Sequence, residues 1–409
     1  MRIVAHHALE EFELANHARK ICAVIAEYNP FHNGHAYQLK KAREKSGADF
    51  IAVLMSGCFT QRGEAALFSP FARGEMALRC GADMVFSSPV SVSVREADSY
   101  AEYNVRLLNQ LHYITHLAFG AECGDLPLLE EIARILETPN DDLDKAYKRH
   151  LDTHACSHAQ ALCRALNETY GVPEDIVSQP NNILAISYLR ALRKTKSKIQ
   201  PVVVQRLKSY HEREVEMDFP SATSLRSAIR RGDWASVKPA VPEEAFKVMQ
   251  AAALKGEIST EENVDRLLQY RLATITKEEF WSLPDAYEGI ENLIFKRNHA
   301  ALTREELILH SSTRRYSMAR MSRLLCHALL HTNQTVWSML PEHLHLVGFR
   351  SEAACVVKRL EKYRIQVVQR RRISQVSEQL QADRRADAVW YTTTNGKGGL
   401  SQMRKTMIF

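Results

Sequence analysis

The sequence lacks a long hydrophobic run, and this absence limits where the protein works. None of its apolar stretches approaches the roughly 18 residues that a membrane-spanning helix needs. The first 20 residues carry acidic side chains and no apolar signal core, so we expect no export. With a hydrophobic fraction of 45% and a charged fraction of 25%, the composition predicts a globular cytoplasmic protein without a membrane partner.

Paired cysteines are lacking too. None of the eight cysteines belongs to a CxxC motif, and we interpret them as scattered reduced thiols. Cys58 stands in a glycine-bearing loop after an expected strand, which makes it a conceivable nucleophile. No catalytic triad can be identified around it, so the structural interpretation is the simpler one.

The sequence also contains no internal repeat and no low-complexity tract. A chain of 409 residues exceeds one ordinary hydrophobic core, which indicates two domains. The net charge of +6 and an isoelectric point near 8.8 permit a nucleic-acid partner without requiring one.

Short apolar runs alternate with helical stretches in the first half of the chain. This rhythm predicts an α/β fold, with a parallel sheet covered by helices on both faces. Ligands of such sheets bind beyond the carboxyl ends of the strands, where small and polar residues follow each run. The expected strands are residues 21–26, 50–55, 82–86 and 114–119, and the expected helices between them are 35–45, 70–79 and 100–111.

The second half of the chain has a different texture. Asn181 is expected to cap a helix over 182–193, a strand follows at 201–205, and Ser221 opens another helix. After about Trp234 the pattern is mostly helical. The expected division is an N-terminal extension (1–20), an α/β domain (21–234), a mostly helical, basic domain (235–391) and a tail (392–409).

The most informative stretch is EYNPFHNGH, Glu27 to His35. It joins a strand to a helix, and the N-terminus of a helix offers free N–H groups and a positive dipole end to anions. His32 and His35 add N–H donors for a phosphate, and Gly34 allows a phosphate or base to approach the backbone. Two alternatives are histidines that only cap the helix and a metal pair, which lacks a nearby third ligand.

A second phosphate motif follows about 190 residues later in SATSLR, Ser221 to Arg226. The hydroxyl groups at the helix start and the forked guanidinium of Arg226 suit a triphosphate tail. On its own the segment is more simply a serine N-cap with a surface arginine. Its presence together with residues 28–35, the histidine turn, favours the phosphate-binding interpretation.

Basic side chains with interleaved tyrosines mark the helical part. They suit either a solvated helix face or the phosphates and unstacked bases of RNA. The two clusters are Arg314, Arg315, Tyr316, Arg320 and Arg323, and Lys358, Arg359, Lys362, Tyr363, Arg364 and Arg370–Arg372.

With these segments considered together, the chain resembles the tRNA(Met) cytidine acetate ligase family, a branch of the HIGH-type nucleotidyltransferase superfamily. The resemblance runs from about Lys20 to about Tyr391 and is densest in ICAVIAEYNPFHNGH, VLMSGCFTQRGE, QPNNILAISYLRAL, SATSLRSAIRRG and LVGFRSE. It implies a Rossmann-like parallel sheet with a mostly helical C-terminal domain. It also implies that ATP and acetate form acetyl-adenylate, whose acetyl group passes to the wobble cytidine of elongator tRNA(Met).

The resemblance further implies a set of site residues. His32, His35 and Arg226 would be catalytic, stabilising the phosphates as pyrophosphate leaves. Phosphate chemistry, rather than the resemblance, predicts that Mg²⁺ accompanies ATP, since no dedicated carboxylate cage is visible. The implied ATP site comprises Ile25, Ala26, Glu27, Tyr28, Asn29, Pro30, Phe31, His32, Asn33, Gly34, His35, Ala36, Tyr37, Gln38, Gly120, Asn181, Arg206, Ser221, Thr223 and Arg226.

Three positions depart from the pattern that the resemblance leads us to expect. Ser88 stands in place of Glu, Tyr103 in place of Gly, and Ala185 replaces another glycine. Two alternative functions therefore stay open. One is a small-molecule adenylyltransferase, and the other is a divergent paralogue that binds nucleotide or RNA without turnover.

Overall fold

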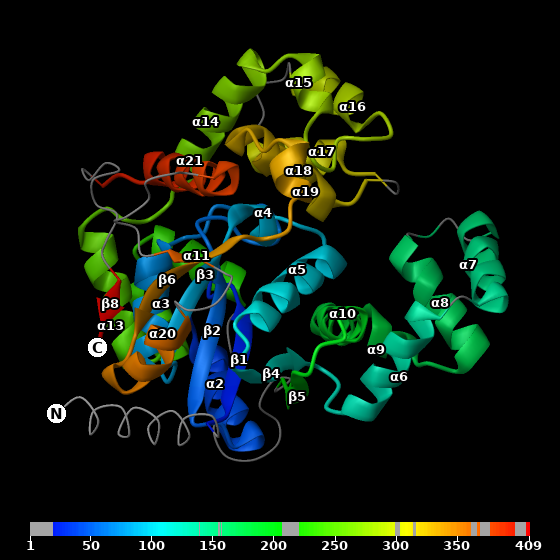
Figure 1. The fold of residues 1–409 in the computed structure, drawn as a ribbon. Helices are drawn as coiled ribbons and strands as arrows, with labels where there is room; N and C mark the ends of the chain where they lie inside the picture. The colour runs from blue at the N-terminus through cyan, green and yellow to red at the C-terminus, as the bar shows by residue number, and fades with distance from the viewer. Residues whose placement is uncertain are drawn as a thin grey trace.

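A central sheet with helices on both faces and a helical layer above it make up the fold (Figure 1). The structure is a computed structural model, and it confirms the predicted Rossmann-like α/β class. No helix among the described residues is long and apolar enough to span a bilayer. The described residues are 19–138, 140–153, 156, 158–206, 221–298, 303–313, 316–360, 366–368, 377–396 and 406–409.

The sheet has the strand order β5-β4-β1-β2-β3-β6-β7, and β8 pairs with β6. Strands β1 to β5 are mutually parallel where they pair, and β6 runs antiparallel to β3. The carboxyl ends of the parallel strands therefore share one edge, with β1 near the middle. The strands are β1 (Ile21–Ala26), β2 (Phe50–Ser56), β3 (Met84–Ser88), β4 (Ile114–Ala121), β5 (Gln200–Gln205), β6 (His343–Phe349), β7 (Gln366–Val368) and β8 (Met407–Ile408).

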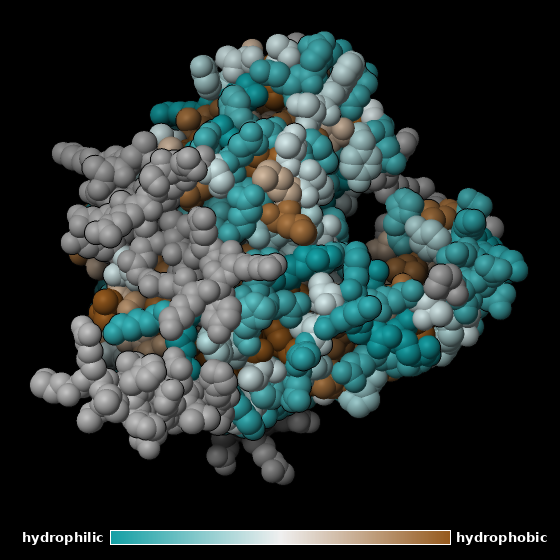
Figure 2. Space-filling view, viewed as in Figure 1, coloured by the Kyte–Doolittle hydropathy of each residue, from teal (hydrophilic) through white to brown (hydrophobic). Residues whose placement is uncertain are grey.

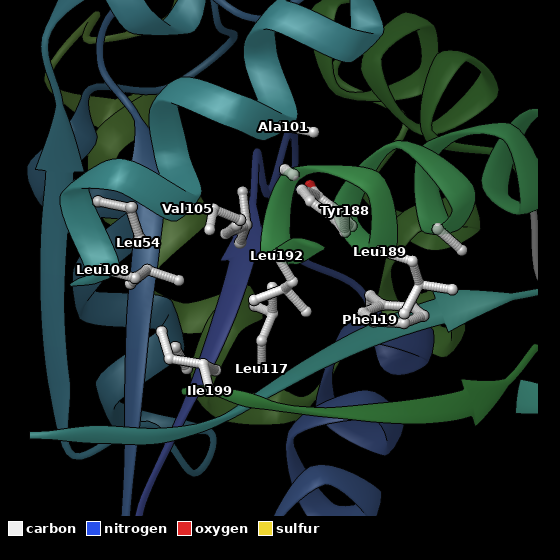
Figure 3. Packing of buried hydrophobic residues seen from close by; sticks show 14 of the residues in the cluster. Leu54, Ala101, Val105, Leu108, Leu117, Phe119, Tyr188, Leu189, Leu192 and Ile199 are labelled. Atoms are coloured by element: carbon white, nitrogen blue, oxygen red, sulfur yellow. The ribbon is translucent and has the colours of Figure 1, made fainter. Parts of the chain in front are cut away.

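Both faces of the sheet are buried, which explains why β1 is almost continuously apolar. Ile21, Ala23 and Ile25 belong to a first core cluster, whereas Cys22 and Val24 belong to a second. This alternation follows from the two-residue period of a strand. The first cluster packs beneath α5 (Ala97–Gln110) and α10 (Pro180–Lys194), as Figure 3 shows. The second lies under α2 (Asn33–Ser46), α3 (Pro70–Arg79) and α13 (Glu243–Leu254).

A lobe of helices extends beside the first cluster, on the right in Figure 1. Within it α7 and α8 pack on each other. Figure 2 shows mostly polar side chains over this face of the molecule and a hollow between the lobe and the helical layer. The lobe consists of α6 (Leu126–Glu137), α7 (Asp141–Thr153), α8 (His158–Tyr170) and α9 (Glu174–Ser178).

The helical layer covers the loops that leave the sheet. Its core, the third cluster, includes Phe59 after β2 and Val90 after β3, so the layer packs directly on those loops. Fully buried Met321 and Leu324 are at its centre. The layer contains α14 (Glu261–Thr274), α15 (Lys277–Trp281), α16 (Ile290–Asn298), α17 (Arg304–Ser311), α18 (Met318–Leu330), α19 (Gln334–Ser338) and α21 (Glu378–Thr392), with α4 (Val90–Ser93) beneath it.

The C-terminal half is not purely helical, because β6, β7 and β8 return to the sheet. Strand β6 is hard to predict from the sequence because two of its buried residues, His343 and His345, are polar. Both donate to Asp383 Oδ2, at 2.6 and 2.8 Å, and this shared carboxylate ties α21 to β6. The second core cluster also continues past the expected boundary near residue 235, through α12 (Trp234–Val237) to Met249 of α13.

Several expected boundaries were wrong by a few residues. Strand β3 covers Met84–Ser88 rather than 82–86, because its pairing with β2 continues to Ser56. Helix α2 begins at Asn33 rather than His35. Asn181 does not cap α10, which begins at Pro180, a residue preorganised for the first helical position.

Candidate active site

Two histidines form the start of α2. His32 is the N-cap residue, and its Nδ1 accepts a hydrogen bond from the Gly34 amide at 3.1 Å. His35 Nδ1 accepts from the His32 amide at 3.2 Å, which completes a capping box built from two imidazoles. A neutral imidazole carries one proton, so each ring holds it on Nε2. Both Nε2–H groups are therefore free to donate to an anion.

Packing fixes the orientation of these rings. The two imidazoles stack with centroids 3.7 Å apart, and the His35 ring lies 4.8 Å from the fully buried Tyr28 ring. Phe31, also fully buried, lies 5.6 Å from His35. A Cβ at Gly34 would lie only 2.9 Å from His32 Cε1, which explains the glycine. The donors are thus held in place before any ligand binds.

Both histidines are neutral at physiological pH. Burial, aided by the positive charge of Arg206, lowers the pKa of His32 to about 4. Burial and the neighbouring His32 lower the pKa of His35 well below its ordinary value. Neutral rings can therefore donate hydrogen bonds but carry no charge, and Arg206 is the cation beside them.

A cavity of about 80 Å³ lies against the two rings and the ends of β4 and β5. Gly120 stands opposite Val204 in the strand register, and a Cβ there would point toward Arg206 and Gln38. The glycine therefore keeps the cavity open. The lining residues are His32, Gly34, His35, Tyr37, Gln38, Gly120, Val204, Gln205 and Arg206, of which Val204 and Gln205 were not anticipated from the sequence.

A hydrogen-bonded chain places the Arg206 side chain. Its backbone N–H donates to Ala121 O at 2.8 Å, and its Nη1 donates to Asn181 Oδ1 at 3.3 Å. Asn181 Nδ2 in turn donates to Glu122 Oε1 at 2.5 Å, and Glu122 Oε2 accepts from the Asn182 amide. Asn181 thus positions Arg206 instead of lining the cavity. Glu122, directly after β4, is one of the polar residues expected to line the crevice, but it was not included among the ATP-site residues.

The second phosphate motif meets the histidine turn through Arg226. Ser221 caps α11 (Ala222–Arg230), and Arg226 donates to Thr223 Oγ1 at 3.2 Å and to Asn29 O at 3.0 Å. Arg226 also lies 3.3 Å from the Glu64 carboxylate. Thr223 and Arg226 line a separate cavity of about 580 Å³ rather than the cavity beside the histidines. The structure therefore joins the two motifs by a hydrogen bond but not in one cavity.

The other expected site residues shape the turn. Asn29 Oδ1 accepts from the Leu67 amide, and a cis peptide joins Asn29 to Pro30. Asn33 Nδ2 donates to Pro239 O. Ile25, Ala26 and Ala36 pack in the core clusters rather than along the cavity.

The chain is similar to known proteins along most of its length. A family model described as HIGH Nucleotidyl Transferase matches residues 19–404. The tRNA(Met) cytidine acetate ligase of Acetivibrio thermocellus is 32% identical over 358 residues, which cover 84% of this chain and 86% of that protein. The protein of the same name from Caldanaerobacter subterraneus is 33% identical over 347 residues, with coverages of 83% and 85%. The chain belongs to the tRNA(Met) cytidine acetate ligase family.

A solved structure extends this assignment to the fold. The crystal structure of Thermotoga maritima TmcAL bound with alpha-thio ATP matches with a TM-score of 0.84 and 25% sequence identity. The match covers 95% of this chain and 100% of that chain, so it includes the helical layer as well as the sheet.

Within this ligase family the three departures occupy packed positions. Ser88 is buried, and its hydroxyl donates to Met55 O at 3.3 Å. The Arg95 guanidinium lies 3.6 Å from the Tyr103 ring and 4.1 Å from the Trp337 ring. Ala185 is fully buried in α10. None of the three departures lines either cavity.

The expected basic surface needs correction at two arginines. Arg320 and Arg323 are buried, at 9% and 7% exposure, so they do not form a solvated helix face. Arg320 pairs with Glu288 at 3.0 Å, and Arg323 Nε donates to Asp285 Oδ2 at 2.8 Å. Tyr316 is buried as well. Lys358 and Arg359 are described, whereas Arg314, Arg315, Lys362, Tyr363, Arg364 and Arg370–Arg372 lie outside the described residues.

Cys58 does not have the setting of a nucleophile. It is 4% exposed in the third core cluster, and its thiol donates to Asp387 Oδ1 at 3.0 Å. Reactive cysteines need access to a substrate, which this position denies.

Proposed function

We infer that this protein is an ATP-dependent ligase that activates acetate as acetyl-adenylate and acetylates the wobble cytidine of elongator tRNA(Met). The observation that carries the adenylation step is the pair of neutral histidines, whose Nε2–H donors face a cavity flanked by Arg206. Membership of the ligase family supports acetate as the acyl substrate and tRNA(Met) as the acceptor. We place the reaction in the cytoplasm, where unmodified tRNA is available to the enzyme.

The first step needs charge stabilisation more than proton transfer. An acetate oxygen attacks the α-phosphorus of ATP, and pyrophosphate leaves with the bonding electrons. The Nε2–H groups of His32 and His35 and the guanidinium of Arg206 stabilise the growing negative charge. They need no reorganisation, because packing and the capping box already hold them.

Mg²⁺ fits this site as a companion of ATP. Among the described residues that line the cavity, none carries a carboxylate, and Glu122 is engaged by Asn181 and Asn182. The ion would be held by phosphate oxygens and water, as Mg²⁺ often is. It would supply positive charge to the β- and γ-phosphates.

The second step takes place on a base edge. The exocyclic amine of cytosine attacks the acetyl carbonyl carbon, and AMP leaves. The base must first leave its stack, which a single-stranded anticodon loop allows at low cost. The helical layer packs over the loops after β2 and β3, and we propose that it holds the tRNA beside the site.

Acetylation of tRNA tests the proposed function directly. Purified protein with ATP, Mg²⁺ and radiolabelled acetate is expected to label an elongator tRNA(Met) transcript. A transcript with uridine at the wobble position is the matched control and should stay unlabelled, because it lacks the amine. Acetate-dependent ATP–pyrophosphate exchange without tRNA labelling would contradict the proposal that tRNA(Met) is the acetyl acceptor. Nucleotide binding with neither signal would favour a paralogue without turnover.

The low histidine pKa values predict an unusual pH profile for adenylation. With a pKa near 4, His32 keeps its Nδ1 unprotonated, and this atom can accept from the Gly34 amide. The rate of ATP–pyrophosphate exchange should therefore stay constant from about pH 8 to about pH 5.5. Protonation places a proton on Nδ1 and breaks the cap, so activity is lost only as the pH falls further. The exchange rate is measured with the acetate anion saturating at each pH. A midpoint near 6.5, the ordinary histidine value, would contradict the neutral pair.

A further inference from the structure

Glu27 places a carboxylate directly after β1, one residue before the histidine turn begins at Tyr28. The two-residue period of the strand puts it on the same face as Ile25, which belongs to the first core cluster. Its electrostatic neighbours on that face include Tyr188 of α10, whose pKa is raised by burial and then by the Glu27 charge. The side chain is only partly buried at the carboxyl edge of the sheet, and it lies beside the histidine turn without lining either of the two cavities described above.

The position of this carboxylate is fixed on one side only. Glu27 Oε1 accepts from the Gln61 amide at 2.7 Å, and the Gln61 side chain donates to Arg95 O at 2.6 Å. The Glu27 carbonyl accepts from Arg73 Nη1 at 2.5 Å, which holds the backbone. In the described part of the chain, no hydrogen bond reaches Oε2 of Glu27. One oxygen is therefore anchored while the other is available to a ligand.

Acetyl transfer to cytosine needs a proton acceptor that the histidines do not offer. When the exocyclic amine attacks the acetyl carbon, it must lose a proton. In His32 and His35 the Nδ1 atoms already accept backbone hydrogen bonds and the Nε2 atoms carry protons. Arginines have no acceptor.

The neighbouring carboxylates are already engaged. Glu64 pairs with Arg226 at 3.3 Å, and both oxygens of Glu122 accept hydrogen bonds from Asn181 and Asn182. Among the described carboxylates beside the histidine turn, Glu27 thus keeps an unoccupied oxygen and, unlike Glu64, forms no ion pair.

We propose that Glu27 Oε2 binds the exocyclic amine of the wobble cytosine and accepts its proton during acetyl transfer. This assignment rests on the function proposed above. In the step, the amine nitrogen forms a bond to the acetyl carbon, and the bond from that carbon to the adenylate oxygen breaks. AMP leaves with the electron pair, and the amine proton passes to the Glu27 carboxylate and then to water.

The environment of Glu27 suits this role. Burial raises the pKa of Glu27, and the hydrogen bond from Gln61 offsets that rise only in part. A base whose pKa moves toward neutrality accepts a proton more readily at physiological pH. The carboxylate also favours cytosine over uracil, since it accepts from an amino group and repels the oxygen that replaces it in uracil.

The test compares the two half-reactions in Glu27→Gln. The glutamine side chain keeps an oxygen that can accept from the Gln61 amide, but it cannot take up a proton at physiological pH. Single-turnover acetyl transfer should fall by about 100-fold or more, a much larger loss than any change in acetate-dependent ATP–pyrophosphate exchange. Glu27→Asp should recover part of the transfer rate. Glu44→Gln, which alters an exposed ion pair with Lys41 at the far end of α2, is the matched control.

Two further readouts separate catalysis from structure. The wild-type transfer rate should rise with pH along an acid limb that Glu27→Gln lacks. In the absence of acetate, wild type should bind the cytidine transcript about ten-fold more tightly than the uridine transcript, and the variant should lose that preference. Equal loss of exchange and transfer, or unchanged transfer, would overturn the assignment. Wild type that labels no tRNA would instead overturn the proposed function on which it rests.

Discussion

Replacing His35 by Asn is expected to reduce acetate-dependent ATP–pyrophosphate exchange by about 100- to 1,000-fold, the usual effect of losing one preorganised donor. The Asn amide oxygen can still accept from the His32 amide, as Nδ1 does at 3.2 Å, so the helix start is preserved. What the variant loses is the Nε2–H group beside the cavity. Binding of tRNA, measured by filter retention, should stay near normal.

His35→Gln is the matched control for this prediction. Its longer side chain can place an amide N–H near the position of Nε2 but gives up the hydrogen bond to His32. We therefore expect it to retain more exchange activity than His35→Asn while starting α2 less firmly. His35→Ala removes both contacts and leaves a gap beside Tyr28 and Phe31. Equal loss of adenylation and tRNA binding in the Asn variant would show that the histidine is structural.

The histidine turn and the parallel strands could be predicted because their signals are local. Apolar runs buried on both faces need no distant partner to be recognised, and the carboxyl ends of β1, β4 and β5 adjoin in the sheet. The expected residues His32, Gly120 and Arg206 consequently line one cavity. Thr223 and Arg226 could not be placed in the same way, since they come from a helix outside the sheet.

Long-range pairing explains what the sequence did not reveal. Arg320 and Arg323 look like a basic surface along α18, but their partners Glu288 and Asp285 lie more than 30 residues earlier. Strand β6 contains two histidines that become compatible with burial only through Asp383, about 40 residues later. Burial shifts the pKa of that aspartate upward, but hydrogen bonds from the two histidines outweigh it and lower the pKa.

Arg73 likewise depends on partners that are distant in sequence, and its replacement is the second change from which we expect a large effect. It is fully buried in α3, and its guanidinium donates to Phe68 O, Glu27 O, Ser56 O and Gly57 O. Burial lowers the pKa of Arg73 to about 10, so it stays charged at physiological pH. A buried cation that bonds to carbonyl groups at the ends of β1 and β2 holds both strand ends in place.

Arg73→Met should therefore destabilise the protein by about 3 kcal/mol or more, because several buried carbonyl groups lose their donor at once. Urea unfolding followed by circular dichroism measures this loss. Arg79→Met lies on the same helix, where Arg79 makes a partly exposed ion pair with Glu75, and should cost less than about 1 kcal/mol. Because Arg73 also holds the Glu27 carbonyl, the folded fraction of Arg73→Met should lose acetyl transfer as well. Similar stability for the two variants would mean that the strand ends are held by the surrounding core and not by this cation.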